Sequence, residues 1–253
     1  MNHLVVALIV FICLFGSALF GSYIRERLPD HHLSDESVSV VKLATGLIAT
    51  LTALVLGLLV SSAKTTFDTT NAELEGAAAK VMQFDRLLAR YGPDAQAIRT
   101  QLKHNYAEVL QVLASRDSAK LALLDGPEAI SRSEALRQQV EALSPATDNQ
   151  RTFKSAALQG MEAVYAARWL TLLQANHSIP PAMLVILVTW LSVIFGSFGL
   201  FAPRNGTIVV VLMLCALSAA ATILLVEELN RPLDGLINVS LAPMEHTLQR
   251  LGE

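Results

Sequence analysis

Residues 43–63, LATGLIATLTALVLGLLVSSA, run for 21 positions without an Asp, Glu, Lys or Arg. About 20 apolar residues is the length that an α-helix needs to cross the roughly 30 Å hydrocarbon core of a bilayer. Within lipid, each backbone N–H and C=O must be hydrogen-bonded inside its own helix or inside a closed barrel. Barrel strands would be shorter and would alternate between apolar and polar residues. The stretch is therefore predicted to be a membrane-spanning helix.

Three further stretches of similar length also lack charged residues: residues 4–23, 179–202 and 206–226. The first is expected to be a retained membrane helix, because Met1-Asn2-His3 has no Lys or Arg and the apolar run exceeds a signal-peptide core. The stretches form two pairs with 115 polar-patterned residues between them. The sequence thus predicts an all-α integral membrane protein with four transmembrane helices and an extramembrane helical bundle inserted between the second and third.

The chain is expected to have four parts. Residues 1–63 form a first transmembrane hairpin, 64–178 the bundle, 179–229 a second hairpin and 230–253 a C-terminal amphipathic tail. In the tail, apolar residues recur at helical spacing while the polar side is not basic. We therefore expect the tail to pack on the bundle rather than to lie on the membrane surface.

The second membrane helix is predicted to continue far beyond the bilayer. No proline occurs between residues 43 and 91, and helical spacing of apolar residues persists until Gly92-Pro93. Three more helices are expected, at about residues 93–115, from the Asp125-Gly126-Pro127-Glu128 break to about 144, and at about 147–176. The bundle is thus predicted to be built on helices that continue the membrane spans.

Charge and cysteine content exclude some classes of function. The net charge is −3, and residues 64–178 carry thirteen basic and thirteen acidic side chains. A nucleic-acid surface needs clustered Lys and Arg, so we expect no nucleic-acid partner. Cys13 and Cys215 both fall within predicted spans, which leaves no disulfide in the extramembrane part and no indication of compartment.

Enzyme and pump signatures are absent from the sequence. It has no His-Glu-x-x-His, phosphate-loop or Gly-x-Ser-x-Gly motif. None of the four stretches contains the ionisable residue that proton relays and coupled transporters use. We therefore expect no enzyme activity, no catalytic residues and no cofactor, and we favour passive conduction or a structural role.

Several short strings in fixed order resemble one known family. They are GLIATLTALVLGLL at 46–59, SAK at 62–64, FD at 67–68, DRLLA at 85–89, YGP at 91–93, FGLFAPRN at 198–205, RPLDGLI at 231–237 and SLAP at 240–243. Together they resemble the bestrophin-like family of bacterial membrane proteins. The chain departs from the pattern at Asn230 and Leu233, where an acidic residue and a phenylalanine are expected.

The resemblance implies a multi-pass protein of the bacterial inner membrane. It also implies likeness to the bestrophins, which are oligomeric anion channels with four membrane helices and an intracellular helical region. Such likeness in architecture does not transfer function. The basic residues favour a cytoplasmic first loop: three lie in residues 24–42 and one at Arg204, against Lys64 and Arg231 on the other side. This predicts a periplasmic bundle and periplasmic termini.

The second span offers two candidate surfaces. Gly46, Thr50, Ala53 and Gly57 form a small-residue stripe, which lets membrane helices pack closely. On a neighbouring face, Thr45 and Thr52 with Lys42 at the entrance are candidates to line a pore in an oligomer. The alternative for the threonines is that their hydroxyls bond back to carbonyls of their own helix.

Other candidates lie in the second hairpin. Phe195 and Phe198 could form a constriction that gates by dewetting, or could simply face lipid or the core. Glu227 and Glu228 could line a pore mouth, or could pair with Arg231.

A metal site is not expected in the first loop. His31 and His32 stand near Asp30 and Asp35, but adjacent loop residues rarely converge on one ion.

Two hypotheses for function follow from the sequence. The first is a homo-oligomer in the lipid bilayer that conducts ions passively through a pore lined by the second span. The alternative is a non-conducting sensor or scaffold whose bundle binds a protein or lipid partner.

Overall fold

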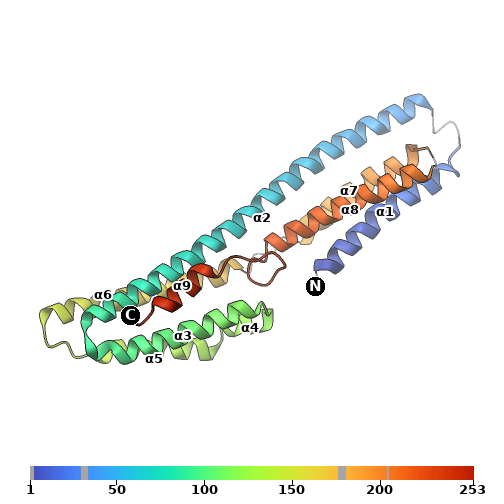
Figure 1. Ribbon diagram of the computed structural model, residues 1–253. Coiled ribbons are helices and arrows are strands. Elements are labelled where there is room, and N and C mark those ends of the chain that lie inside the picture. The colour runs from blue at the N-terminus through green and yellow to red at the C-terminus, as the bar shows by residue number, and fades with distance from the viewer. Residues whose placement is uncertain (1–2, 30–33, 176–180, 204) are drawn as a thin grey trace. The chain divides into compact units, whose positions relative to one another are not determined.

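The computed structural model describes residues 3–29, 34–175, 181–203 and 205–253. These residues form α-helices and one 3-10 helix, and no strand occurs among them (Figure 1). In chain order the elements are α1 His3–Arg25, α2 Asp35–Tyr91, η2 Pro93–Ala95, α3 Gln96–Ser115, α4 Ser118–Leu123, α5 Pro127–Ala142, α6 Asp148–Ala175, α7 Pro181–Phe201, α8 Gly206–Leu229 and α9 Ala242–Arg250. The predicted all-α class is confirmed.

The chain divides into two compact units. The first comprises Met1–Thr65 and Ser178–Asn230, and the second comprises Thr66–His177 and Arg231–Glu253. The first unit contains α1, α7, α8 and the N-terminal part of α2, which are long and apolar enough to cross a membrane. The prediction of four membrane-spanning helices is therefore confirmed. Within this unit α1 packs against both α7 and α8.

Helix α2 is longer than the sequence predicted. It has 57 residues, about 85 Å at 1.5 Å per residue, and starts at Asp35 rather than near residue 43. Asp35 and Glu36 in its first turn favour this earlier start, because carboxylates stabilise the positive end of the helix dipole. The C-terminal end is where it was predicted: Gly92 adopts φ 117°, and Pro93 then begins η2.

The second unit is a helical bundle with one core. Its buried side chains come from α2, α3, α5, α6 and the tail. The centre includes Phe84, Leu88, Val140 and Met161, each 1% exposed or less. Helix α9 belongs to this bundle, since Met244 and the following Leu251 lie in the core.

The prediction of a single break between the second and third bundle helices was incomplete. Helix α3 ends at Ser115 because Arg116 adopts a left-handed φ of 53°. The short helix α4 follows, capped by the Asp117 carboxylate, which accepts a hydrogen bond from the Ala119 amide at 3.0 Å. Helix α5 then begins at Pro127, after the predicted break, and ends at Ala142.

Candidate functional site

The weakly polar face of α2 is buried within the first unit. Thr45 and Thr52 are 8% and 3% exposed. The Thr45 hydroxyl donates to the hydroxyl of Ser197 on α7 at 3.2 Å. Thr52 donates to the carbonyl of Ile48 at 2.7 Å, which is the back-bonding alternative for a helical threonine. That these two residues line a pore stays a prediction, and it requires this face of α2 to separate from α7.

The small-residue stripe of α2 has the opposite environment. Gly46, Thr50, Ala53 and Gly57 are exposed in the first unit. A Cβ atom built on either glycine would have no neighbour within 4 Å. The stripe is therefore an accessible surface of the unit, and its role in helix packing is a prediction about contacts with another chain. Lys42, immediately before the charge-free stretch 43–63, is also exposed.

The close glycine packing that the structure does show joins α1 to α7. A Cβ atom on Gly199 would lie 1.8 Å from the carbonyl oxygen of Ala18. One on Gly21 would lie 2.1 Å from the carbonyl oxygen of Gly196. Only glycine lets the two backbones approach this closely. The sequence gives no sign that α1 is the partner of Gly196 and Gly199.

The two constriction candidates are next to each other on α7 but differ in exposure. The rings of Phe195 and Phe198 form an edge-to-face pair with centroids 6.2 Å apart. Phe195 is 5% exposed, whereas Phe198 is 49% exposed. Phe195 is thus a core residue that supports the accessible ring of Phe198.

The two mouth candidates also differ. Glu227 lies with its Oε2 atom 3.6 Å from Nδ1 of His3 on α1. Glu228 is buried at 3% exposure. Arg231 lies 3.7 Å from the carboxylate of Asp234, and its pairing with either glutamate stays a prediction. Glu227 is therefore the more accessible of the two carboxylates.

The first loop adds no metal site. His31, His32 and Asp30 lie outside the described residues, and Asp35 is in the first turn of α2. Among the residues that are described, no group of three His, Cys, Asp or Glu side chains is placed to hold a metal ion.

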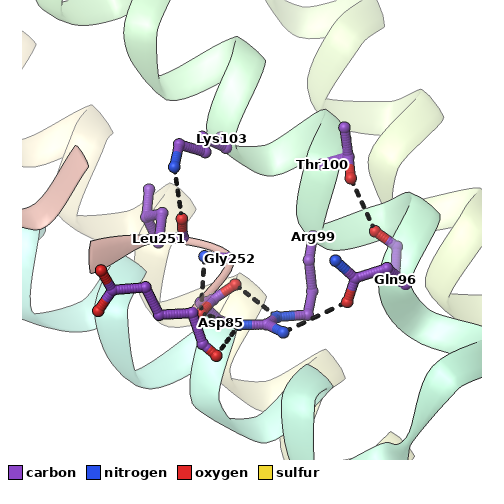
Figure 2. Close-up of polar contacts among 8 residues, drawn as sticks. Asp85, Gln96, Arg99, Thr100, Lys103, Leu251 and Gly252 are labelled. Carbon is purple, nitrogen blue, oxygen red and sulfur yellow. Dashed lines mark hydrogen bonds and ion pairs between the residues drawn. The ribbon is translucent and has the colours of Figure 1, made fainter. Parts of the chain in front are cut away.

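A buried ion pair in the second unit was not predicted. Arg99 on α3 donates from Nε to Oδ1 of Asp85 at 2.9 Å and from Nη2 to Oδ2 at 2.8 Å (Figure 2). The Asp85 and Arg99 side chains are 0% and 7% exposed, so the bidentate pair is shielded from water. The hydrogen bond that Arg99 donates to Asp85 raises the pKa of Arg99 above its ordinary value. Gln96 completes the contact by accepting from Arg99 Nη1 at 3.3 Å.

This ion pair holds the end of the tail. Gly252 donates its amide to Oδ2 of Asp85 at 3.4 Å, and Arg99 Nη2 donates to the carbonyl of Glu253 at 3.3 Å. Lys103, one turn along α3, donates to the carbonyl of Leu251 at 2.8 Å (Figure 2). The pair therefore joins α2, α3 and the segment after α9. The sequence did contain a sign of it, since Asp85 falls on the apolar face of α2 that carries Val81 and Leu88.

Four apolar helices and a helical bundle define the chain as a multi-pass helical membrane protein. A comparison with family models matches the Bestrophin-like domain to residues 11–244. The chain therefore belongs to the Bestrophin-like family, and the resemblance of its sequence strings is confirmed. Searches of curated proteins and of solved structures found no match.

Proposed function

We propose that this bestrophin-like protein forms a homo-oligomer that conducts ions passively along an axis lined by α2. We place it in the bacterial inner membrane, with the bundle and both termini in the periplasm. No residue is assigned a catalytic role. The observation that carries the proposal is the exposed face of α2 within the first unit.

That face is both apolar and exposed. Beside the small-residue stripe, Leu43, Leu47 and Leu51 are 79%, 64% and 44% exposed. Helix α1, by contrast, packs against both α7 and α8 within the first unit. A helix whose small residues face outward is suited to close packing against the same helix of neighbouring subunits. A ring of such helices encloses an axis, which a single four-helix subunit is too small to do.

The proposed transport is passive because residues 43–63 contain no ionisable group. Coupled transporters and proton pumps place such groups within the membrane. Lys42 would stand at one end of the proposed path, and Glu227 with Glu228 would stand at the other. Rings of charged side chains at a mouth select ions by sign. The exposed ring of Phe198, supported by Phe195, is our candidate for an apolar constriction.

Planar-bilayer recording with the purified protein tests conduction directly. Gly57→Leu should reduce or abolish the current and weaken the oligomer, because the new side chain fills the surface where neighbouring α2 helices would pack. Gly16→Leu on α1 is the matched control, since Gly16 also has no neighbour within 4 Å of a Cβ atom. Absence of current over a range of voltages and salts would contradict the proposal, as would equal effects of the two variants.

A non-conducting sensor or scaffold is the second candidate. One feature favours it: α2 is a single helix that continues from a membrane span into the bundle, where Asp85 fixes the tail. A change at the bundle could therefore be carried along one helix to the membrane. A monomeric protein in mild detergent, without current in bilayers and with a crosslinked partner in native membranes, would favour this candidate.

A further inference from the structure

The exposed large apolar side chains of the second unit are unevenly distributed. Six of them are between 39% and 70% exposed, and elsewhere in the described part of this unit no large apolar side chain is as exposed. We call these six the apolar rim: Leu123, Ile130, Trp169, Leu170, Leu236 and Ile237. Ile130 and Trp169 line one open groove.

The rim lies at one end of the bundle. Helices α2 and α6 run antiparallel, since Gln150 donates to the carbonyl of Tyr91 at 3.3 Å and Gly160 lies against Leu87. The C-terminal part of α6, which carries Trp169, is therefore alongside the part of α2 nearest to its span. The chain passes between the two units at residues 65–66, 177–178 and 230–231.

Polar contacts hold the helices of this end together. Arg168 donates from Nη1 to the Ser133 hydroxyl at 3.0 Å and from Nη2 to the carbonyl of Leu124. The Tyr165 hydroxyl donates to the carbonyl of Ser133. These bonds join α4 and α5 to α6. They bring α4, which carries Leu123, and α5, which carries Ile130, beside the part of α6 that carries Trp169. On the tail side, Leu236 lines a hollow with Leu113 and Arg116.

We infer that the apolar rim inserts into the headgroup layer of the bilayer that the protein spans. Chain continuity with the spans supports a lipid surface as the occupant: α7 begins at Pro181, twelve residues after Trp169, and α8 ends at Leu229, seven residues before Leu236. Tryptophan is enriched at this depth, because its ring has an apolar body and a polar N–H. The inference rests on the membrane class and is independent of conduction.

The charges beside the rim indicate a neutral lipid surface. Residues 116–132 carry three basic and three acidic side chains. A surface that recognises anionic lipids has clustered Lys and Arg instead. The contact is therefore expected with phosphatidylcholine alone.

The two tryptophans of the chain allow a direct test. Trp190→Phe leaves Trp169 as the only tryptophan in the full-length protein, which is then reconstituted into phosphatidylcholine vesicles. Bromine on the acyl chains close to the carbonyl should quench Trp169 emission strongly, bromine near the chain ends should quench it less, and aqueous iodide should have little effect. The purified variant must elute from size-exclusion chromatography as the parent protein does.

A matched control places the reporter at the other end of α6. Asn149 is exposed near the α6 N-terminus, so Asn149→Trp in a chain with both natural tryptophans replaced by phenylalanine reports on the far end of the bundle. Its emission should be quenched by iodide and not by brominated lipid. Trp169 emission that follows this same pattern would overturn the inference. Emission protected from both quenchers would overturn it too, because a second copy or another protein would then cover the rim.

A second probe does not depend on the α7 substitution. A spin label on Leu123→Cys, in a chain with Cys13 and Cys215 replaced by serine, should be more accessible to oxygen than to a water-soluble nickel chelate. The reverse order of accessibility would contradict insertion.

Discussion

Removal of the Asp85 carboxylate is expected to release the tail from the bundle. Asp85→Ala takes away the acceptor of two hydrogen bonds from Arg99, at 2.9 and 2.8 Å, and of one from Gly252 at 3.4 Å. The guanidinium would stay buried, with only Gln96 and a tail carbonyl as partners. A buried charge that has lost its counter-ion is much less stable than the paired charge.

The size of the effect follows from burial. Breaking a buried ion pair by removing one partner costs about 3–5 kcal/mol. Because about 1.4 kcal/mol changes an equilibrium constant tenfold, the population of molecules with a detached tail should rise roughly a hundredfold to a few thousandfold. The exposed pair of Arg151 with Asp148, at 3.0 Å and 72% and 94% side-chain exposure, is the matched control. Its loss in Arg151→Ala should cost about 0–1 kcal/mol.

Hydrogen exchange of the tail amides in detergent-solubilised protein measures this population. Local opening free energies appear directly in the exchange rates. Asp85→Ala should accelerate exchange in residues 242–253 by about the factor above, while Arg151→Ala should leave it within about tenfold of the parent protein. The double substitution Asp85→Leu with Arg99→Met should recover much of the α2–α3 protection, because an apolar pair of similar volume replaces the ions. Exchange in Asp85→Ala no faster than in Arg151→Ala would refute the reasoning.

Two further predictions concern packing and protonation. Gly199→Ala should lower the thermal unfolding midpoint in detergent by a cost of about 1–3 kcal/mol, because its Cβ meets the α1 backbone, while Gly16→Ala should not. An undisturbed midpoint in the Gly199 variant would show that α1 and α7 do not pack as described. Burial raises the pKa of Tyr106 to about 12, so the stability owed to its neutral phenol is present below about pH 10 and is lost as pH rises through about 12. Tyr106→Phe should therefore remove up to about 3 kcal/mol of the fall in the free energy of unfolding between about pH 10 and pH 12, followed by helicity. An unchanged dependence of this free energy on pH would argue against this cause.

The sequence predicted the membrane helices well because their signal is local. An uncharged run of about 20 residues leaves few alternatives to a spanning helix, whatever its neighbours are. The C-terminal end of α2 was also predicted correctly, because Gly92 can adopt a positive φ and Pro93 after it cannot continue the helix. The packing of α9 on the bundle followed from a polar face that is not predominantly basic, and Leu251 lies in the bundle core.

The features that sequence reasoning missed depend on which elements meet. The Asp85–Arg99 pair joins residues fourteen positions apart on two helices. A local sequence pattern does not indicate which residue pairs with a buried charge. Likewise, the threonine and glycine faces of α2 differ little in sequence, but contact with α7 buries one and leaves the other open. The end of α3 at Arg116 is a third case, because a left-handed non-glycine residue has no reliable sequence signal.

The buried positions of α2 lie along one side of the helix. Its buried positions recur at intervals of mostly three, four or seven residues, from Thr45 and Thr52 in the span to Asp85 and Leu88 in the bundle. Such intervals keep them on one side of a helix. At the bundle end of this side, the Asp85 and Arg99 side chains are 0% and 7% exposed. Because unpairing a buried charge is costly, the ion pair fixes which side of α2 faces α3.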